Sequence, residues 1–547
     1  MPWRRKSYEV LPALSVRGPE LRRSLRTVTT AWMFGVVWMS CVSGSHIPVF
    51  CRMLGFNDFH FGLLAALPFA ATIGQLFAAV LVERTGLRKY QFIDCVTLSR
   101  ALWLVPAVLP FVLPIPSGTA VVVLLVVLGL SWFLNAMGTP AFWTWMGDLI
   151  PRRIRGRYMA VRSRLSTLVR VAVVVLVGVL LDAVIDESRP ETAAAQPVLL
   201  YVICAIFAVA AIFGVTDILL FHRIRELRRT TRDRLPPPAF DFRVGPPRRR
   251  SPSGYAGYVL RWLWAPVRQL LLEPLGDRVF RRYVLYGATV AFAMAVGGAF
   301  FLLNALENLG FSKLAAQILF MAVGAVTGFL TAKAWGRLID RWGRRPVLIL
   351  ATFGTCFSAL PWFFVTRETP APQFLLDAVN GVAGWFGQVW LTPADPVGAY
   401  LGGLAAILIG SGCWSGVHLA QTGVILSFSD GSGRSKYVAA SSVLIGLGGL
   451  VGGVVGGGVA WLLAGRSVTL GPFYWRNWHA VFALSVLARI SGLLWLIGMP
   501  DPGARRVRDL IRVMWSQANA GVASRLFYPL RIFGWQRGGR NNRGPKR

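Results

Sequence analysis

Charged residues are scarce in this chain, and their scarcity excludes an ordinary water-soluble protein. Only 15% of its 547 residues are Asp, Glu, Lys or Arg, whereas 55% are apolar. A soluble domain usually carries about 25% charged residues. The excess apolar surface therefore needs lipid. Runs of roughly 20 apolar residues, long enough to cross a bilayer core about 30 Å thick, recur between short polar breaks.

Acidic residues are the scarcest charged group, with 24 Asp and Glu against 58 Lys and Arg, a net charge of +34. In a soluble protein this balance would suggest a nucleic-acid partner. Here the basic residues gather outside the apolar runs, at residues 4–26, 222–282 and 505–547. Cytoplasmic loops of membrane proteins collect Lys and Arg. We therefore predict that both termini and the central segment are cytoplasmic, and that the basic tails contact anionic lipids and bind no nucleic acid.

Residues that carry enzyme chemistry are also few. The six cysteines lie in or beside apolar runs, without the paired spacing of zinc or redox motifs. The sequence has no Gly-x-x-x-x-Gly-Lys-Ser/Thr phosphate loop. It also has no His, Asp, Glu and Cys cluster near a membrane surface that could hold a metal or a nucleophile. We expect neither an enzyme nor a metal or cofactor protein, while a proton or sodium ion as coupling ion stays open.

Twelve apolar runs predict an all-α membrane protein with twelve transmembrane helices. The first run, Val28 to Phe50, is too long for a cleaved signal and eleven more follow it. Residues 374–389 leave two interpretations open, a segment on the outer surface or a thirteenth crossing that would place the basic C-terminal tail outside. The expected divisions are a basic tail over 1–27, a six-helix half over 28–221, a cytoplasmic linker over 222–282 with an interfacial helix as one possibility, a second six-helix half over 283–499, and a basic tail over 500–547.

An internal repeat relates the two halves. Leu54-Gly55-Phe56 after the first run is echoed by Leu309-Gly310-Phe311 after the seventh, and each copy later reaches a charged tight turn. Such self-similarity is typical of transporters built from repeats. The first turn contains Glu83, Arg84 and Gly86, and the second contains Gly336, Asp340, Arg341, Gly343, Arg344 and Arg345.

The second turn resembles the Gly-x-x-x-Asp-Arg-x-Gly-Arg-Arg/Lys signature of the major facilitator superfamily. Its glycines allow a tight turn and close helix contact, and its carboxylate can pair with arginines or a helix N-terminus. The first copy departs from the signature, with Ala79, Glu83 and Leu87 in place of glycine, aspartate and a basic residue. A second resemblance, to the loop between helices 4 and 5 of bacterial members, rests on Asp148, Arg155, Gly156 and Arg157.

The resemblance implies a monomeric secondary transporter that moves a small solute by alternating access. Arginine outnumbers lysine, which suggests a high-GC bacterial genome and thus the inner membrane. The Pro-Glu-Ser/Thr motif of sugar porters and the Gly-Pro signature of drug–proton antiporters are missing, so the subfamily stays unassigned. A receptor or assembly protein that keeps the fold without transporting remains the alternative.

Helices 1, 4, 7 and 10 line the central cavity in this superfamily, so their polar residues are candidates for solute contact. They recur at the three-to-four spacing of one helix face. The alternative is that they only hydrogen-bond neighbouring helices. The candidates are His46 on helix 1, Asn135, Thr139 and Trp143 on helix 4, Asn304 on helix 7, and Trp414, His418 and Gln421 on helix 10.

Two arginines, Arg100 and Arg489, lie deep within predicted spans. A charge at mid-membrane costs at least about 2.5 kcal/mol, so each needs water, a partner or an anion. This favours an anionic solute, although a structural pair with a carboxylate such as Asp94, or with backbone carbonyls, is equally compatible.

Arg52 and Glu307 occupy equivalent places at the outer ends of helices 1 and 7, and we predict that they form an outer gate pair. Buried carboxylates are nearly absent, because Asp182 and Asp217 fall near helix ends. The sequence therefore gives no support to proton coupling through a buried acid.

Overall fold

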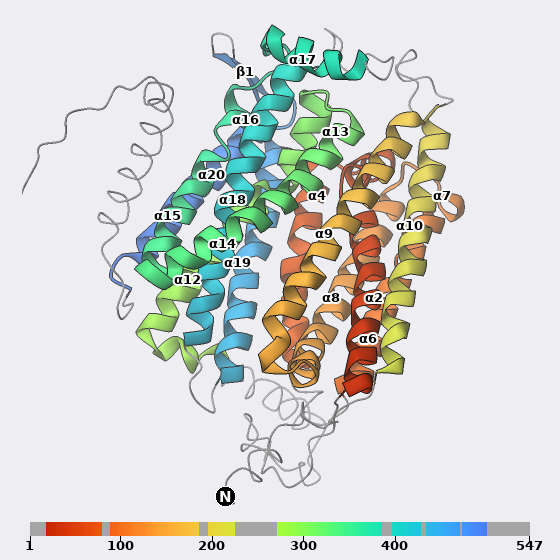
Figure 1. The fold of residues 1–547 in the computed structure, drawn as a ribbon. Helices are drawn as coiled ribbons and strands as arrows, with labels where there is room; N and C mark the ends of the chain where they lie inside the picture. The colour runs from red at the N-terminus through yellow and green to blue at the C-terminus, as the bar shows by residue number, and fades with distance from the viewer. Residues whose placement is uncertain are drawn as a thin grey trace, which may run out of the picture.

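The computed structural model describes residues 18–78, 88–184, 195–224, 271–384, 396–427, 434–470 and 473–499. The C-terminal tail and most of the N-terminal tail and the linker lie outside these residues, as do Glu83, Arg84 and Gly86 of the first charged turn. Two helix bundles stand side by side, the first half of the chain coloured red to yellow and the second green to blue (Figure 1).

The predicted all-helical membrane fold is confirmed. Within the described residues, 11 helices are long and apolar enough to cross a membrane, or 12 if one bent pair counts as a single span. That pair is α2 (Gly18–Cys41) and α3 (His46–Met53), which meet at 48°. Gly44, with φ of 124°, lies in the break and adopts a backbone conformation that favours glycine.

The first span begins ten residues before the Val28 predicted from hydropathy, because its first turns are amphipathic. Leu25 and Val28 pack into a cluster with Phe221, whereas Arg22 and Arg26 are exposed. Hydropathy counts the exposed arginines against a helix, although only one face needs to be apolar.

The remaining helices of the first half follow in chain order. They are α4 (Asp58–Ala70) with η2 (Ala71–Ile73), α6 (Arg88–Ala101) with α7 (Leu104–Val112), α8 (Gly118–Leu149), α9 (Arg152–Ala183) and α10 (Ala195–Leu220) with η3 (Phe221–Arg223). The span that starts with α4 continues to Ala78.

The second half repeats this order and adds two π-helical segments. It contains η4 (Pro274–Gly276), α12 (Arg278–Leu303), the π-helix η5 (Asn304–Asn308), α13 (Lys313–Gln317), the π-helix η6 (Ile318–Val323), α14 (Gly324–Trp342), α15 (Arg344–Phe357), α16 (Pro361–Phe364), α17 (Gln373–Gly384), α18 (Val397–Ser427), α19 (Arg434–Leu462), β1 (Ser467–Leu470), β2 (Phe473–Arg476) and α20 (Asn477–Leu496).

One end of the molecule carries α17 and a hairpin of β1 and β2, and we call it the outer end (Figure 1). The 12 residues of α17 are too few to span a bilayer, and the helix runs across this end. The hairpin pairs Ser467 with Arg476 and Leu470 with Phe473. Sequence analysis did not predict it, although its β-branched and aromatic residues favour strands.

The apolar core is shared between the halves at the outer end. A single buried cluster joins Phe50 and Phe207 of the first half to Phe300 and Phe482 of the second. Two further clusters of buried residues each belong to one half, one around Phe142 and one around Tyr286. Within the described residues, the three clusters therefore bind the two halves to each other at the outer end and hold each half together elsewhere.

Helices α4 and α19 form a seam between the halves in which backbone meets backbone. A Cβ placed on Gly457 would lie 2.8 Å from Gly62 Cα and 2.8 Å from the carbonyl oxygen of Phe59. Gly453 faces Ala66 and Gly449 faces Phe69 along the same line. Small residues permit this approach, which gains dispersion energy where lipid provides no hydrophobic driving force.

We expect Gly457→Val to destabilise the protein by about 1–3 kcal/mol, because its side chain would meet the backbone of α4. Gly458→Val is the matched control, because a Cβ at Gly458 would meet no heavy atom of the described residues within 4 Å. Thermal unfolding of both variants in the same detergent measures the difference. Equal melting temperatures for the two variants would contradict the seam.

Candidate functional site

Arg52 joins the two halves at the outer end. Its Nε and Nη2 atoms donate to the Glu307 carboxylate of η5, over 2.8 and 3.2 Å. The pairing expected from the internal repeat is therefore present. The two side chains are 31% and 37% exposed, so the ion pair contributes at most about 1 kcal/mol.

Asp58 is the buried centre of this contact, and only 8% of it is exposed. Its Oδ1 accepts a hydrogen bond from Arg52 Nη2 at 2.8 Å. Its Oδ2 accepts from Asn477 Nδ2 at 2.7 Å and from Trp478 Nε1 at 3.0 Å, both at the start of α20 in the other half. A buried carboxylate requires such partners. Sequence analysis missed this role, because a polar turn is the usual place for an aspartate.

A second polar contact between the halves involves Asp182, in the last turn of α9. Its two carboxylate oxygens accept from the backbone nitrogens of Lys313 and Leu314, at 2.9 and 3.0 Å. These nitrogens begin α13, where the first N–H groups have no partner in their own helix and the helix dipole favours negative charge. Asp182 was predicted only as a residue near a helix end, and its partner became visible with the structure.

His46 lies where α3 meets the second half, and it is fully buried. Its Nε2 is 2.7 Å from the carbonyl oxygen of Cys41, and its Nδ1 is 3.4 Å from Gln317 Nε2. Ser45 donates to the carbonyl oxygen of Lys313 at 3.1 Å. The structure thus places His46 in the closed outer contact, and solute binding by His46 stays a prediction.

Asn304 begins the π-helix η5 and is buried. Its Oδ1 accepts from Asn308 Nδ2 at 2.8 Å, and Asn308 Oδ1 accepts from Arg476 Nη1 at 2.6 Å. Among the described residues, Asn304 Nδ2 has no hydrogen-bond partner. Single π-turns are frequent at functional sites.

The solute-contact candidates on α8 and α18 differ in how far their side chains are exposed. Trp143 is 49% exposed, and Thr139 donates to the carbonyl oxygen of Asn135 at 2.8 Å. On α18, the rings of Trp414 and His418 lie 5.9 Å apart. His418 is exposed and Gln421 is half-buried. Helix α8 packs mainly on α6, and α18 on α14 and α15.

The surroundings of Arg100 correct one expectation. Asp94, suggested as its carboxylate partner, is exposed, whereas Asp217 of α10 is buried and is the carboxylate that interacts electrostatically with Arg100. The guanidinium carbon lies 3.2 Å from the ring centre of Trp38. Its Nε and Nη1 have no hydrogen-bond partner in the described part of the chain. The charge of Arg100 is therefore stabilised by the aromatic face of Trp38 and by the nearby Asp217 carboxylate.

Arg489 connects three helices of the second half. Its Nη1 donates to the carbonyl oxygen of Thr355 at 2.6 Å and to Ser358 Oγ at 3.3 Å. Thr355 lies in the last turn of α15, and Ser358 directly follows this helix. Its guanidinium carbon lies 5.7 Å from the ring centre of Trp414. The backbone-carbonyl interpretation accounts for this geometry, and contact with solute stays a prediction.

Arg170 is a candidate that sequence analysis missed. It lies on α9 within the span Val161–Ala183, and its Nη2 is 3.4 Å from Met39 Sδ. A thioether is only a weak acceptor. The signal was present in the sequence, because Arg170 is a charge within an apolar run.

The second charged turn has the predicted shape. Helix α14 ends at Trp342, Gly343 follows with φ of 92°, and α15 starts at Arg344. Asp340 and Arg341 are exposed, while Arg344 and Arg345 are half-buried. Within the described chain no heavy atom would meet a Cβ at Gly336, so the close helix contact expected there is not found.

The basic loop between α8 and α9 leads directly into a helix. Arg155, Gly156 and Arg157 lie on the first turns of α9, and Asp148 is the last residue but one of α8. Tyr158, outside the apolar span, bonds to Thr29 of α2 at 3.2 Å. Burial raises the pKa of the Tyr158 phenol, and the bond to Thr29 opposes this rise.

Two helical halves related by an internal repeat, joined at one end and spanning a membrane, define a transporter class that exposes a central site to each side in turn. The family model of the Major Facilitator Superfamily matches residues 54–392, and the chain belongs to this superfamily. It is a multi-pass membrane protein and a secondary transporter. The family points to a transporter and not to an enzyme.

Solved structures share the fold. A D-xylose–proton symporter aligns with a TM-score of 0.56 at 13% identity, covering 88% of this chain and 99% of the symporter. A single-residue mutant of the nucleoside transporter NupG gives 0.54 at 10% identity, over 88% and 99%. The xylose transporter XylE from E. coli gives 0.52 at 14%, over 90% and 99%. No curated protein matches the sequence.

We expect Asp58→Asn to destabilise the closed outer end by about 1–3 kcal/mol, because an amide would turn a donor toward Arg52 or toward Asn477 and Trp478. Thermal unfolding measures the loss. Asp377→Asn is the matched control, since Asp377 is an exposed carboxylate on α17. A melting temperature unchanged in Asp58→Asn would contradict the buried role of Asp58.

Proposed function

We propose that the contacts of Arg52, Asp58 and Glu307 form the outer gate of this secondary transporter, and that its solute is anionic. The observation that supports the gate most strongly is the position of the polar contacts between the halves. The contacts of Arg52 with Glu307 and of Asp182 with Lys313 both lie at the outer end, beside the apolar cluster that the two halves share.

The charges of this gate allow it to open. Arg52 and Asp58 belong to the first half, and Glu307 belongs to the second. When the halves separate, Arg52 keeps Asp58 as its partner, so no unpaired cation stays in a region of low dielectric. Glu307 is already 37% exposed and can be hydrated. Opening therefore exchanges a weak ion pair and several hydrogen bonds for contacts with water.

The two polar contacts occupy separate helix pairs. Arg52 and Asp58 meet η5 and the start of α20, whereas Asp182 of α9 meets α13. An outward-open state requires both to break. The seam between α4 and α19 is formed largely by glycines that face backbone atoms, with the Phe69 ring against Gly449, and such small residues support a rocking motion of the halves.

The support for an anionic solute comes from Arg170 and no longer from Arg100 and Arg489. The first two have partners within their own halves, namely Trp38 with Asp217 and the Thr355 carbonyl. Arg170 has a thioether neighbour that cannot balance its charge. An intramembrane cation without a balancing partner tends to mark the path of an anion. We propose the bacterial inner membrane as location and a proton or sodium gradient as driving force.

We expect Glu307→Gln to raise the population open at the outer end by up to about fivefold, the equivalent of 1 kcal/mol. Cys51 is a native reporter, because it lies beside Arg52 and is only 1% exposed in the closed state. A membrane-impermeant maleimide applied from outside should modify it faster in the variant, and Cys51→Ala identifies the labelled site.

Glu368→Gln is the matched control, because Glu368 is an exposed carboxylate near the same end. Labelling of Cys51 that is equally slow in wild type and Glu307→Gln would contradict the gate.

We expect Arg170→Gln to reduce uptake of anionic solutes in proteoliposomes at least about tenfold, because the cation that offsets solute charge is lost. A panel of anions, amino acids, sugars and peptides is assayed with imposed proton and sodium gradients. Arg164→Gln, at an exposed position of the same helix, should transport like wild type. Wild-type uptake by Arg170→Gln would exclude the proposed role.

A further inference from the structure

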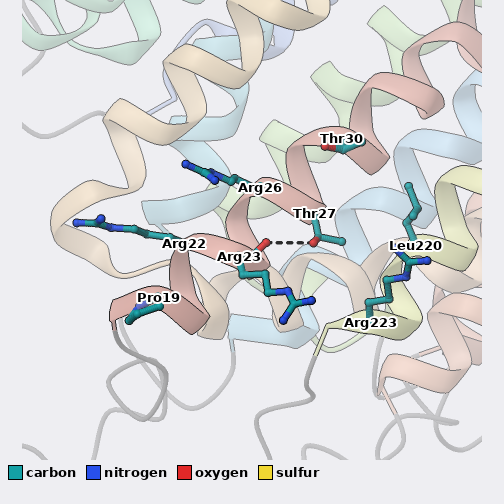
Figure 2. A pocket seen from close by; sticks show the side chains of 8 residues that line it. All are labelled: Pro19, Arg22, Arg23, Arg26, Thr27, Thr30, Leu220 and Arg223. Atoms are coloured by element: carbon teal, nitrogen blue, oxygen red, sulfur yellow. Dashed lines mark hydrogen bonds between the residues drawn. The ribbon is translucent and has the colours of Figure 1, made fainter.

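A basic hollow lies at the inner end of the first half, between the start of α2 and the end of α10 (Figure 2). Its volume is about 780 Å³. Arg22, Arg23 and Arg26 line it from α2, and Arg223 lines it from η3. Thr30 of α2 and Leu220 of α10 also line it. We call it the inner basic hollow.

Within the described residues, the hollow carries positive charge without a compensating carboxylate. The lining residues that these parts of the chain contribute include neither Asp nor Glu. Among the described residues, none of the four guanidinium groups makes an ion pair or a hydrogen bond with another side chain. Cations that line one hollow repel one another. An anion with several oxygens would remove this repulsion, and guanidinium groups bind phosphate oxygens two at a time.

The inner basic hollow is separate from the proposed solute site. All of its lining residues belong to the first half, on α2 and on α10 with η3. A central solute site in this fold lies where the two halves meet. The preference for basic residues at cytoplasmic helix ends explains that arginines occur at this depth. It does not explain why arginines from two helices line one hollow.

The apolar surface beside the hollow indicates the source of the phosphate. Between α2 and α10, the rings of Phe34 and Phe213 are in contact at 5.4 Å and are half-buried. On α10, Ile212 is 61% exposed and Leu219 is 47% exposed. An acyl chain would cover such residues in the bilayer while its headgroup stays at helix-end depth. A soluble phosphate would gain nothing from them.

We propose that the inner basic hollow binds the phosphate of an anionic phospholipid from the inner leaflet, with an acyl chain along α10. Basic pockets between transmembrane helices on the cytoplasmic side suit such headgroups. Arg23 and Arg223, whose side chains lie on the same side of α2 in Figure 2, hold the phosphate diester, and Leu220 beside them contacts the glycerol and the first methylenes. The lipid thereby ties the start of α2 to the end of α10 within one half.

The test measures lipid binding by the full chain, so its result does not depend on transport. Native mass spectrometry of the purified protein counts bound phosphatidylglycerol, with phosphatidylcholine as the zwitterionic comparison. We expect the double variant Arg23→Gln with Arg223→Gln to bind phosphatidylglycerol at least about tenfold more weakly than wild type, because each juxtamembrane arginine strengthens anionic-lipid binding severalfold.

Arg278→Gln with Arg281→Gln is the matched control. These two exposed arginines begin α12, the counterpart of α2 in the second half, and do not line the hollow. The control should bind phosphatidylglycerol like wild type. An equal loss in both double variants would overturn the proposal, because general surface charge would then explain the binding. Leu220→Glu, which places a carboxylate in the hollow without removing an arginine, should reproduce the loss in a folded protein.

A second arm distinguishes the two sources of phosphate. Inorganic phosphate and glycerol phosphate are added during the lipid measurement at ionic strength matched with chloride. If the proposal holds, phosphatidylglycerol stays bound at millimolar concentrations of either competitor. Displacement by these competitors, or phosphate binding without preference for phosphatidylglycerol, would overturn the lipid assignment and identify a soluble anion as the ligand.

Discussion

The hydrocarbon core of a bilayer offers no hydrogen bonds, and this constraint organises the whole structure. Every backbone group at that depth needs a partner within the protein, so the chain crosses as helices. Two departures from regular helix occur where the other half covers them. The break at Gly44 faces Gln317, and the π-helix η5 begins at the buried Asn304. At these two places protein replaces lipid around the irregular backbone.

The same constraint explains why the contacts between the halves differ along the molecule. At the outer end the halves share an apolar cluster and charged contacts centred on Asp58 and Asp182. Along the seam they meet through glycines instead. Each half also keeps a buried cluster of its own, around Phe142 or Tyr286, so it stays folded when the shared contacts break. This division is what a transporter with two alternating openings requires.

Hydropathy, charge bias and the internal repeat were sufficient to predict the helices, because these features repeat over many residues. Twelve spans were predicted, and the described residues contain 11 helices that can cross a membrane, or 12 with the bent pair. The start of α2 and the hairpin before α20 were missed, since amphipathic turns and short strands leave weak signals. The turn at Gly343 was predicted from a motif, because only its backbone conformation matters.

Individual contacts were harder to predict than helices. The pairing of Arg52 with Glu307 followed from the repeat, which fixes where equivalent residues lie. The partner of Arg100 did not follow, because Asp94 and Asp217 are both compatible with the sequence and only packing places one of them inside. Asp58, Asp182 and Arg170 each depend on a neighbour far away in the chain, and a single sequence carries no record of that distance.

The glycine seam also bears on how the protein can change over evolutionary time. Where Gly457 meets Gly62 and Phe59, its geometry is set by a Cα atom and a carbonyl group, which every residue type shares. Side chains facing lipid or solute can therefore diverge while the relative placement of α4 and α19 stays fixed. The seam thus gives the two halves a constant packing surface. New solute specificities can evolve at other positions while this surface stays the same.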